Sequence, residues 1–309
     1  MFKKILIANR GEIALRIHRA CKDMGIKTVA VHSTADENAM HVRLADESVC
    51  IGPPLIKDSY LNIPSIISAA TIANVDAIHP GVGFLSENAE FAKVVNDHGF
   101  KFIGPKQEHL SIMGNKILAK KTAYDIGIPI LPGSLGNVTS YNEALKISNK
   151  IGFPLLIKAT NGGGGRGIKK VFSKSELKQS FFLAKSEAKQ SFGDDSVYIE
   201  KYLTNPRHIE IQIIADKYGN VESVGERDCS IQRRNQKLIE ECPSPVLNDS
   251  QREDIYSVCT SAMKKLNYEN IGTIEFLYED NNFFFIEMNT RLQVEHPITE
   301  MVYGVDLVK

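Results

Sequence analysis

The chain has 309 residues, of which 43% are hydrophobic and 24% are charged, a composition typical of soluble globular proteins. Lysine plus arginine and aspartate plus glutamate both number 37, so the formal net charge is zero. Nucleic-acid-binding proteins usually carry an excess of basic residues, so we expect no nucleic-acid partner. We also expect no membrane partner, because no apolar run reaches the length that spans a bilayer.

The cysteine pattern points to a reducing compartment. The five cysteines are Cys21, Cys50, Cys229, Cys242 and Cys259, and no two of them form a C-x-x-C pair. An odd number without such spacing argues against a disulfide framework or a zinc site. The apolar run at 5–8 is too short for the core of a signal peptide. We therefore expect a cytoplasmic protein.

The first hundred residues alternate between strand and helix patterns. Strands are predicted at 5–8, 28–31, 75–79 and 100–103. Helices are predicted at about 13–24, 63–73 and 86–97, and Ser86 is the predicted N-cap of the last. Such alternation predicts a parallel sheet with helices on both faces.

The rest of the chain follows a different pattern. A helical connection is predicted at about 105–127, and two capping boxes, Ser173 with Glu176 and Ser250 with Glu253, predict the starts of long helices. Further strands are predicted at 154–159, 168–172, 197–203, 208–215, 273–279 and 283–289. A last helix is predicted at 299–309, and the spacing of 232–237 favours a solvated basic turn.

A glycine-rich segment at 162–167 separates two of these strands. By letter it contains G-x-G-x-x-G, with an acidic residue at the distance expected of a dinucleotide-binding fingerprint. That fingerprint needs a helix after the glycines, whereas a strand is predicted here. We interpret the segment as a flap whose backbone amides close over phosphates, with Lys158 and Arg166 adding positive charge. A flexible surface loop is the alternative.

Two glutamates lie on the strands of the predicted C-terminal hairpin. A three-residue loop at 280–282 would place Glu275 directly opposite Glu287, where two carboxylates repel each other. A divalent cation between them would relieve this, and Asn289, on the same face as Glu287, would supply a third oxygen. Two solvated glutamates on an outer face are the alternative.

The segment 289–297 follows this hairpin. Arg291 continues the face of Glu287 and Asn289, and Glu295 follows four residues later. An arginine and a glutamate beside a metal-phosphate site could bind an anionic acceptor and remove its proton. A surface ion pair is an equally good interpretation of these two residues alone.

Taken together, these segments resemble the ATP-grasp superfamily, and more narrowly the biotin carboxylases. The matching stretches are 7–14, 79–81, 83–88, the glycine loop, 226–230, 287–291 and 293–297, in order along the whole chain. The resemblance implies a Rossmann-like domain over 1–114, followed by an α+β ATP-grasp domain over 115–309 with a mobile lid at about 131–203. It also implies a C-terminal domain beyond Lys309, so we expect this sequence to be truncated.

The resemblance implies an ATP-dependent ligase that carboxylates biotin with bicarbonate. The residues implied to contact ATP are Lys116, Lys158, Gly164, Gly165, Glu200, Lys201, Tyr202, Leu203, His208, Gln232, Asn235, Glu275 and Glu287. Two Mg²⁺ or Mn²⁺ ions would bind Glu275, Glu287 and Asn289. Bicarbonate would bind Lys237, Arg291 and the backbone of Val294. Glu295 would deprotonate it for attack on the γ-phosphate, and Arg291 would stabilise the biotin enolate, which gives Arg291, Glu295 and Lys237 the catalytic roles.

The implied partners are the biotin carboxyl carrier protein and the carboxyltransferase subunits of acetyl-CoA carboxylase, in fatty acid biosynthesis. The family's full-length members imply a homodimer, which is less expected of a truncated chain. Two positions depart from the family pattern: Asn235 stands where a histidine contacts the nucleotide, and Val82 replaces a tyrosine near the biotin region. The alternatives are an inactive ATP-binding or interaction fragment, the biotin carboxylase part of a propionyl-CoA or pyruvate carboxylase, and another ATP-grasp ligase.

Overall fold

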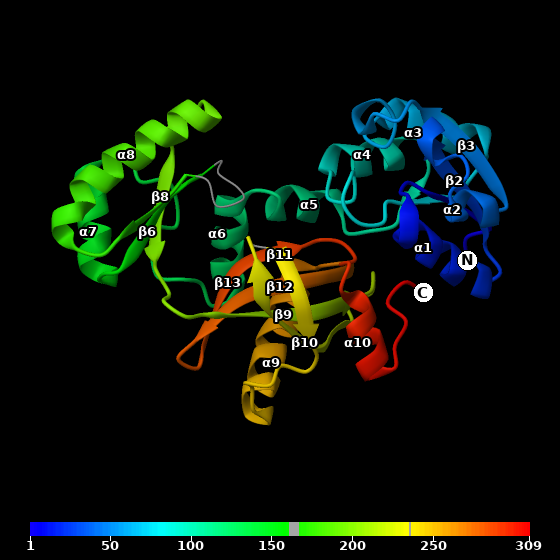
Figure 1. Ribbon diagram of the computed structural model, residues 1–309. Coiled ribbons are helices and arrows are strands. Elements are labelled where there is room, and N and C mark those ends of the chain that lie inside the picture. Colours follow the sequence, from blue (N-terminus) through cyan, green and yellow to red (C-terminus); the bar gives the residue numbers. More distant parts are fainter. Residues whose placement is uncertain (161–166, 235) are drawn as a thin grey trace.

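The computed structural model describes residues 1–160, 167–234 and 236–309. Three groups of elements, each built around its own sheet, follow one another along the chain (Figure 1). Within the described ranges, no helix is both long enough and apolar enough to cross a membrane.

The first group is a parallel sheet with helices around it, as the alternating pattern predicts. Its strands are β1 (Lys4–Ile7), β2 (Lys27–Ser33), β3 (Glu47–Gly52), β4 (Ala77–His79) and β5 (Lys101–Phe102). Its helices are α1 (Gly11–Asp23), α2 (Met40–Leu44), α3 (Ile63–Ile72) and α4 (Ala89–Asp97), with short 3-10 turns at Thr34–Asp36 and Ile56–Asp58. The strand order β3-β2-β1-β4-β5 is that of a Rossmann fold.

The start of α4 differs from the sequence expectation. Its N-cap is Asn88 rather than Ser86, because the Asn88 side chain accepts a hydrogen bond from the backbone N–H of Phe91 at 2.8 Å. Residues 83–88 therefore form an irregular loop at the carboxyl end of β4. This loop carries Glu87 toward the C-terminal part of the chain.

A helical connection leads into a small second sheet. It consists of α5 (Gln107–Met113) and α6 (Lys116–Ile126), and the second group contains α7 (Tyr141–Ile151), β6 (Leu155–Ala159), β7 (Ile168–Val171), α8 (Lys174–Phe192) and β8 (Val197–Lys201). The sheet is antiparallel with the order β7-β6-β8. Strand β7 confirms that a strand, not a helix, follows the glycine segment. Residues 162–166 of that segment lie outside the described residues.

The third group is a five-stranded antiparallel sheet with the order β11-β10-β9-β12-β13. Its elements are β9 (Arg207–Ala215), β10 (Val221–Arg233), β11 (Gln236–Glu241), α9 (Asp249–Leu266), β12 (Asn270–Glu279), β13 (Asn282–Asn289) and α10 (His296–Tyr303). One face packs against α9 and α6 through a core that includes Ile209, Ile211 and Phe276. The other face carries polar side chains.

Three sequence predictions for this group are wrong in detail. Helix α9 begins after Asn248, which forms the capping box with Gln251, so the box is not Ser250 with Glu253. The segment around 232–237 joins β10 to β11, and Lys237 points inward instead of into solvent. Helix α10 ends at Gly304, in a left-handed conformation, so it does not run to residue 309.

The first and third groups share apolar contacts. Leu292 and Leu307, which flank α10, belong to the same buried cluster as Ile13 and Ile17 of α1. Figure 1 shows α10 and the C-terminus beside α1. This contact fixes the loop between β13 and α10, and with it the side chains that the loop carries.

Candidate active site

The β12–β13 hairpin places Glu275 directly opposite Glu287, as predicted, but by a different route. The turn has two residues, Asp280 and Asn281, both with positive φ, so the expected three-residue loop is wrong. A β-bulge between Glu275 and Phe276 then restores the pairing, because Ile286 is an extra residue in β13.

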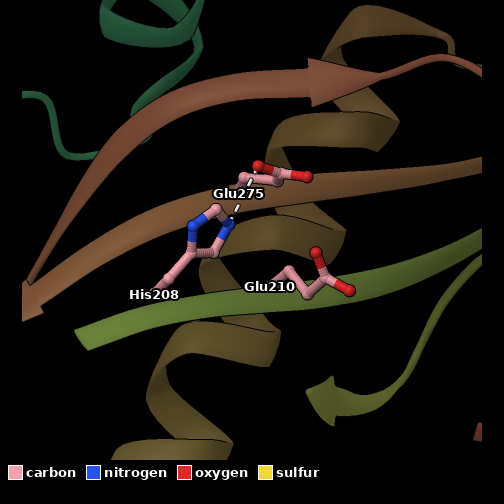
Figure 2. Close-up of side chains that lie close together, drawn as sticks. All are labelled: His208, Glu210 and Glu275. Atoms are coloured by element: carbon pink, nitrogen blue, oxygen red, sulfur yellow. Dashed lines mark ion pairs between the residues drawn. The ribbon is translucent and has the colours of Figure 1, made fainter. Parts of the chain in front are cut away.

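Glu275 is the most heavily contacted carboxylate of this face. Its oxygens accept hydrogen bonds from Asn289 Nδ2 at 2.7 Å, Gln293 Nε2 at 3.0 Å and Lys237 Nζ at 2.9 Å, and His208 Nε2 lies 2.9 Å away (Figure 2). Burial by itself would raise the pKa of Glu275. The nearby His208 and the charge of Lys237 outweigh burial and hold this pKa well below its usual range.

Glu287 has the opposite electrostatic environment. Burial and the nearby Glu275 carboxylate raise the pKa of Glu287 above its ordinary value. Its side chain lines a pocket, as described below. Two facing carboxylates repel each other, and a cation between them would stabilise the arrangement.

Two groups of described residues bring three potential metal-ligating atoms within 4.8 Å of one another. One group is His208, Glu210 and Glu275, which Figure 2 shows side by side on β9 and β12. The other is Glu210, Cys229 and Glu295. Glu287 belongs to neither group, but it faces Glu275 across the hairpin, and Asn289 lies beside Glu275 with its amide oxygen accepting a hydrogen bond from Arg291.

Lys237 of β11 links three carboxylates. Its ammonium lies 2.5 Å from Glu210, 2.9 Å from Glu275 and 2.6 Å from Glu295. Burial lowers the pKa of Lys237, but these carboxylates more than offset this and raise it above its ordinary value. The ammonium therefore stays charged at neutral pH and holds the sheet and the following loop together.

Arg227 of β10 lies at the centre of this polar face and is completely buried. Each of its five N–H groups has an acceptor: Glu210 at 2.5 Å, Gln212 at 2.9 Å, Thr299 at 2.7 Å, Thr273 at 3.3 Å and Gln293 at 2.5 Å. These partners come from β9, β12, the loop after β13 and α10. The guanidinium thus joins the sheet to the loop that carries Arg291 and Glu295.

Arg291 is held from the N-terminal group. Its Nε donates to Glu87 at 2.7 Å, and one of its terminal nitrogens donates to Asn289 at 2.9 Å. Glu87 also accepts a hydrogen bond from the backbone N–H of Thr290 at 3.1 Å. Contacts with the Glu87 carboxylate of the first group therefore orient Thr290 and Arg291, and Arg291 in turn contacts Asn289.

Replacing Glu87 by glutamine is expected to lower about tenfold the kcat/KM of the bicarbonate-dependent ATP hydrolysis that the sequence resemblance implies, because Arg291 would lose its fixed orientation. Stability should change by less than about 1 kcal/mol, since the Glu87 side chain is 39% exposed. Steady-state kinetics and thermal unfolding check both statements. Glu90→Gln, an exposed glutamate three residues on, is the matched control. Unchanged kinetics of Glu87→Gln would contradict the orienting role.

A pocket lies between the small sheet, α6 and the β12–β13 hairpin. Apolar side chains including Leu131, Leu277 and Phe285 form its walls. Four predicted ATP contacts line it: Lys116, Lys158, Glu200 and Glu287. Lys158 Nζ forms an ion pair with Glu200. An apolar slot with charged groups at its edge suits a flat ring joined to an anionic chain.

The other predicted contacts lie elsewhere or are not described. Lys201 donates to the backbone carbonyl of Phe153, and Tyr202 accepts a hydrogen bond from Lys170. Leu203 follows β8, and His208 pairs with Gln232 and with Glu275, outside this pocket. Gly164, Gly165 and Asn235 lie outside the described residues.

The predicted bicarbonate residues divide in a similar way. Lys237, Glu295 and Val294 line one hollow, next to Pro297 and Ile298. Arg291 lines a different hollow beside His79 and Gly81 of the first group. The structure thus brings the predicted base and the predicted ammonium together and keeps the arginine at Glu87.

Comparisons with known proteins agree with this arrangement along the whole chain. Residues 1–110 match the family described as biotin carboxylase, N-terminal domain, and residues 115–309 match the ATP-binding domain of the carbamoyl-phosphate synthase L chain. A biotin carboxylase of Nostoc sp. is 58% identical over 308 residues, which cover 99% of this chain and 69% of that protein. This chain belongs to the biotin carboxylase family.

Solved biotin carboxylase structures share the fold. The biotin carboxylase of Campylobacter jejuni in a complex with a β,γ-ATP ligand has a TM-score of 0.91 at 50% identity, over 100% of this chain and 69% of that one. The biotin carboxylase domain of a thermophilic 2-oxoglutarate carboxylase bound to bicarbonate has a TM-score of 0.94 at 46% identity, over 100% and 68%. Membership of this family identifies an ATP-dependent ligase, and it excludes the ATP-grasp ligases of other families.

Sequence reasoning missed several residues that the structure places at the candidate site. Glu210 and Arg227 were passed over, although Glu210 alternates with buried isoleucines in β9 and Arg227 lies in the matched stretch 226–230. Glu87 also lies in a matched stretch, but its partners Thr290 and Arg291 are about 200 positions away along the chain, so no local pattern indicates its role. Lys120 gave only the signal of a lysine one helical turn after Lys116.

Proposed function

We propose that this chain uses ATP and bicarbonate to carboxylate biotin on a carrier protein. The observation that carries the proposal is the position of Lys237. Its ammonium contacts Glu275, the predicted metal ligand, and Glu295, the predicted base. A fixed cation between these two groups is placed to receive a small anion beside the phosphates.

The reaction begins with bicarbonate bound by Lys237, Arg291 and the backbone N–H of Val294. Glu295 accepts the bicarbonate proton, and the freed oxygen attacks the γ-phosphorus of ATP while the bond to ADP breaks. Burial raises the pKa of Glu295. The charge of Lys237 and its hydrogen bond lower this pKa by more, so it lies below the ordinary value. The carboxylate is therefore ionised and ready to act as a base at neutral pH.

The product of this step is carboxyphosphate. Cleavage of its bond between carbon and the bridging oxygen gives CO₂ and inorganic phosphate. The released phosphate accepts the N–H proton of a ureido nitrogen of biotin, the Arg291 guanidinium stabilises the negative charge that develops on the ureido oxygen, and the deprotonated nitrogen attacks CO₂.

The residues around Glu275 fit magnesium or manganese. All-oxygen ligands suit these ions, and facing carboxylates are supplied by Glu275 and Glu287. Asn289 would contribute oxygen once its amide turns away from Arg291. Two bound ions would neutralise the phosphate charges of ATP and leave its γ-phosphorus open to attack.

ATP would lie in the pocket between α6 and the hairpin. Its base and sugar would occupy the apolar slot, and its phosphates would extend toward Lys116, Lys158 and the amides of Gly164 and Gly165. Lys201, Tyr202, Leu203, His208, Gln232 and Asn235 would complete its contacts. This assignment divides the chain into a Rossmann-like domain over 1–114 and an ATP-grasp domain over 115–309, with a lid at about 131–203.

The proposed partners are the carrier protein and the carboxyltransferase subunits of acetyl-CoA carboxylase, in the cytoplasm and in fatty acid synthesis. All five cysteines are unpaired, which supports a reducing compartment. A homodimer is also proposed from the family. The same first half-reaction would serve a propionyl-CoA or pyruvate carboxylase.

Hydrolysis of ATP with ¹⁸O-labelled bicarbonate tests the proposed chemistry. Carboxyphosphate keeps the attacking bicarbonate oxygen on phosphorus, so labelled phosphate is the expected product. Glu287→Gln should lower the rate by about 10²-fold, because one metal-binding carboxylate is lost. Glu253→Gln, on the exposed side of α9, is the control and should leave the rate unchanged.

Unlabelled phosphate would show that water, not bicarbonate, attacks ATP, and would overturn the mechanism. Absence of hydrolysis with measurable ATP binding would instead support an inactive ATP-binding fragment. Addition of biotin then tests the transfer of CO₂ to biotin separately. Carboxybiotin should form only in variants that also form carboxyphosphate.

A further inference from the structure

Lys120 of α6 occupies an unusual position at the edge of the nucleotide pocket. Its side chain is 12% exposed, and the ammonium itself is buried. Among the described residues, no side chain or backbone group forms a hydrogen bond with its Nζ. Lys120 is one of the residues that line the pocket.

The carboxylate that pairs with Lys120 is already engaged. Glu200 lies 3.6 Å from the Lys120 ammonium, and its other oxygen forms a closer ion pair with Lys158. The Tyr198 ring lies 5.7 Å from the ammonium, and this cation–π contact attracts the charge but supplies no acceptor for its N–H groups. Two ammonium groups therefore share one carboxylate at this edge of the pocket.

A buried ammonium without a hydrogen bond is destabilising, and burial lowers the pKa of Lys120 as expected. An apolar side chain of similar length would fill the same space without this cost. The arrangement is explained if the missing partner is part of a ligand that enters the pocket. Each ammonium N–H needs an acceptor, and Lys120 lines the pocket that such a ligand would enter.

We propose that Lys120 is a nucleotide-binding residue whose ammonium donates a hydrogen bond to an acceptor atom of bound ATP, on the side of the pocket formed by Glu200 and Tyr198. The inference rests on the proposed function, because it assumes that this pocket holds ATP. Two parts of the nucleotide offer acceptors: the ring nitrogens of the base and the phosphate oxygens. Both match an ammonium donor.

Lys120→Met tests the inference, because methionine nearly preserves the length of the side chain and removes its charge. The dissociation constant for ADP, measured by calorimetry, should rise about tenfold or more. The midpoint of thermal unfolding without nucleotide should stay constant or rise, because an unsatisfied buried ammonium has been removed. A lysine with only a structural role would give the opposite pair of results.

The matched control is Lys121→Met, the next residue on α6, whose side chain is exposed. It should change neither the ADP affinity nor the unfolding midpoint. If Lys120→Met does not fold, Lys120→Gln gives the same readout with a neutral polar side chain. An ADP affinity within twofold of the wild type in the folded variant would overturn the inference.

Adenosine identifies which part of the nucleotide Lys120 contacts. A weaker affinity of Lys120→Met for both adenosine and ADP would indicate the base, and a weaker affinity for ADP alone would indicate the phosphates. Failure of the proposed function gives a distinct result. A wild-type chain that binds ADP but lacks bicarbonate-dependent hydrolysis would refute the function and leave the Lys120 inference standing, whereas a wild-type chain that does not bind ADP would refute both.

Discussion

Replacing Arg227 by methionine is expected to lower the free energy of unfolding by about 3–5 kcal/mol, the largest loss of stability that we predict for one substitution. Methionine fills much of the volume but offers no hydrogen bond. Glu210, which is also completely buried, would lose its 2.5 Å contact with the guanidinium. A buried carboxylate deprived of one of its two cations is costly, and the acceptors Gln212, Thr273, Gln293 and Thr299 lose a donor as well.

Urea unfolding monitored by circular dichroism measures this loss. Arg19→Met is the control, since Arg19 lies on the exposed side of α1 and should change stability by no more than about 0.5 kcal/mol. A loss below about 1 kcal/mol for Arg227→Met would mean that the cluster tolerates an apolar centre. In that event the positive charge of Lys237 alone would be enough to stabilise the buried carboxylate of Glu210.

Replacing Lys237 by glutamine is expected to lower kcat/KM for bicarbonate by about 10²–10³-fold, the largest effect on activity. The neutral side chain would no longer attract bicarbonate. It would also leave Glu275 and Glu295 without the cation that lies 2.9 Å and 2.6 Å from them, so their mutual repulsion would grow. ADP binding should change little, because Lys237 does not line the nucleotide pocket.

Initial rates at varied bicarbonate, together with ADP titration, separate these two effects. Lys217→Gln, an exposed lysine between β9 and β10, controls for the loss of one positive charge. A rate for Lys237→Gln within threefold of the wild type would exclude Lys237 from bicarbonate binding. Equal loss of ADP affinity would indicate that the substitution disturbs the whole site.

The sequence predicts the alternation of β9 correctly but not what covers its polar face. Charged residues at every second position usually indicate a solvent-exposed face, and Glu210 follows that pattern. In the structure Glu210 is completely buried, because Lys237, Arg227 and the segment before α10 cover it. That cover comes from parts of the chain far along the sequence, and no local pattern reports it.

Helix starts show a similar limit. Ser86 and Ser250 both have the residue type of an N-cap, yet Asn88 and Asn248 take the role two positions away. Several residues in each segment are suitable caps, so tertiary packing decides among them. The strand-helix order was predictable because it depends on patterns within single elements, whereas the facing glutamates were predicted from a wrong loop length and pair in this chain because the bulge at Ile286 offsets the shorter turn.

The bulge in β13 allows two adjacent residues to serve one surface. In a regular strand, neighbouring side chains point to opposite faces, so an apolar wall and a carboxylate could not adjoin along the chain. The extra residue suspends that rule, and both Ile286 and Glu287 line the nucleotide pocket. Deletion of Ile286 would straighten the strand and keep the two glutamates facing each other, but the apolar residue next to Glu287 in the pocket lining would be lost. The extra residue in β13 therefore serves the shape of the pocket, and the pairing of the two glutamates does not require it.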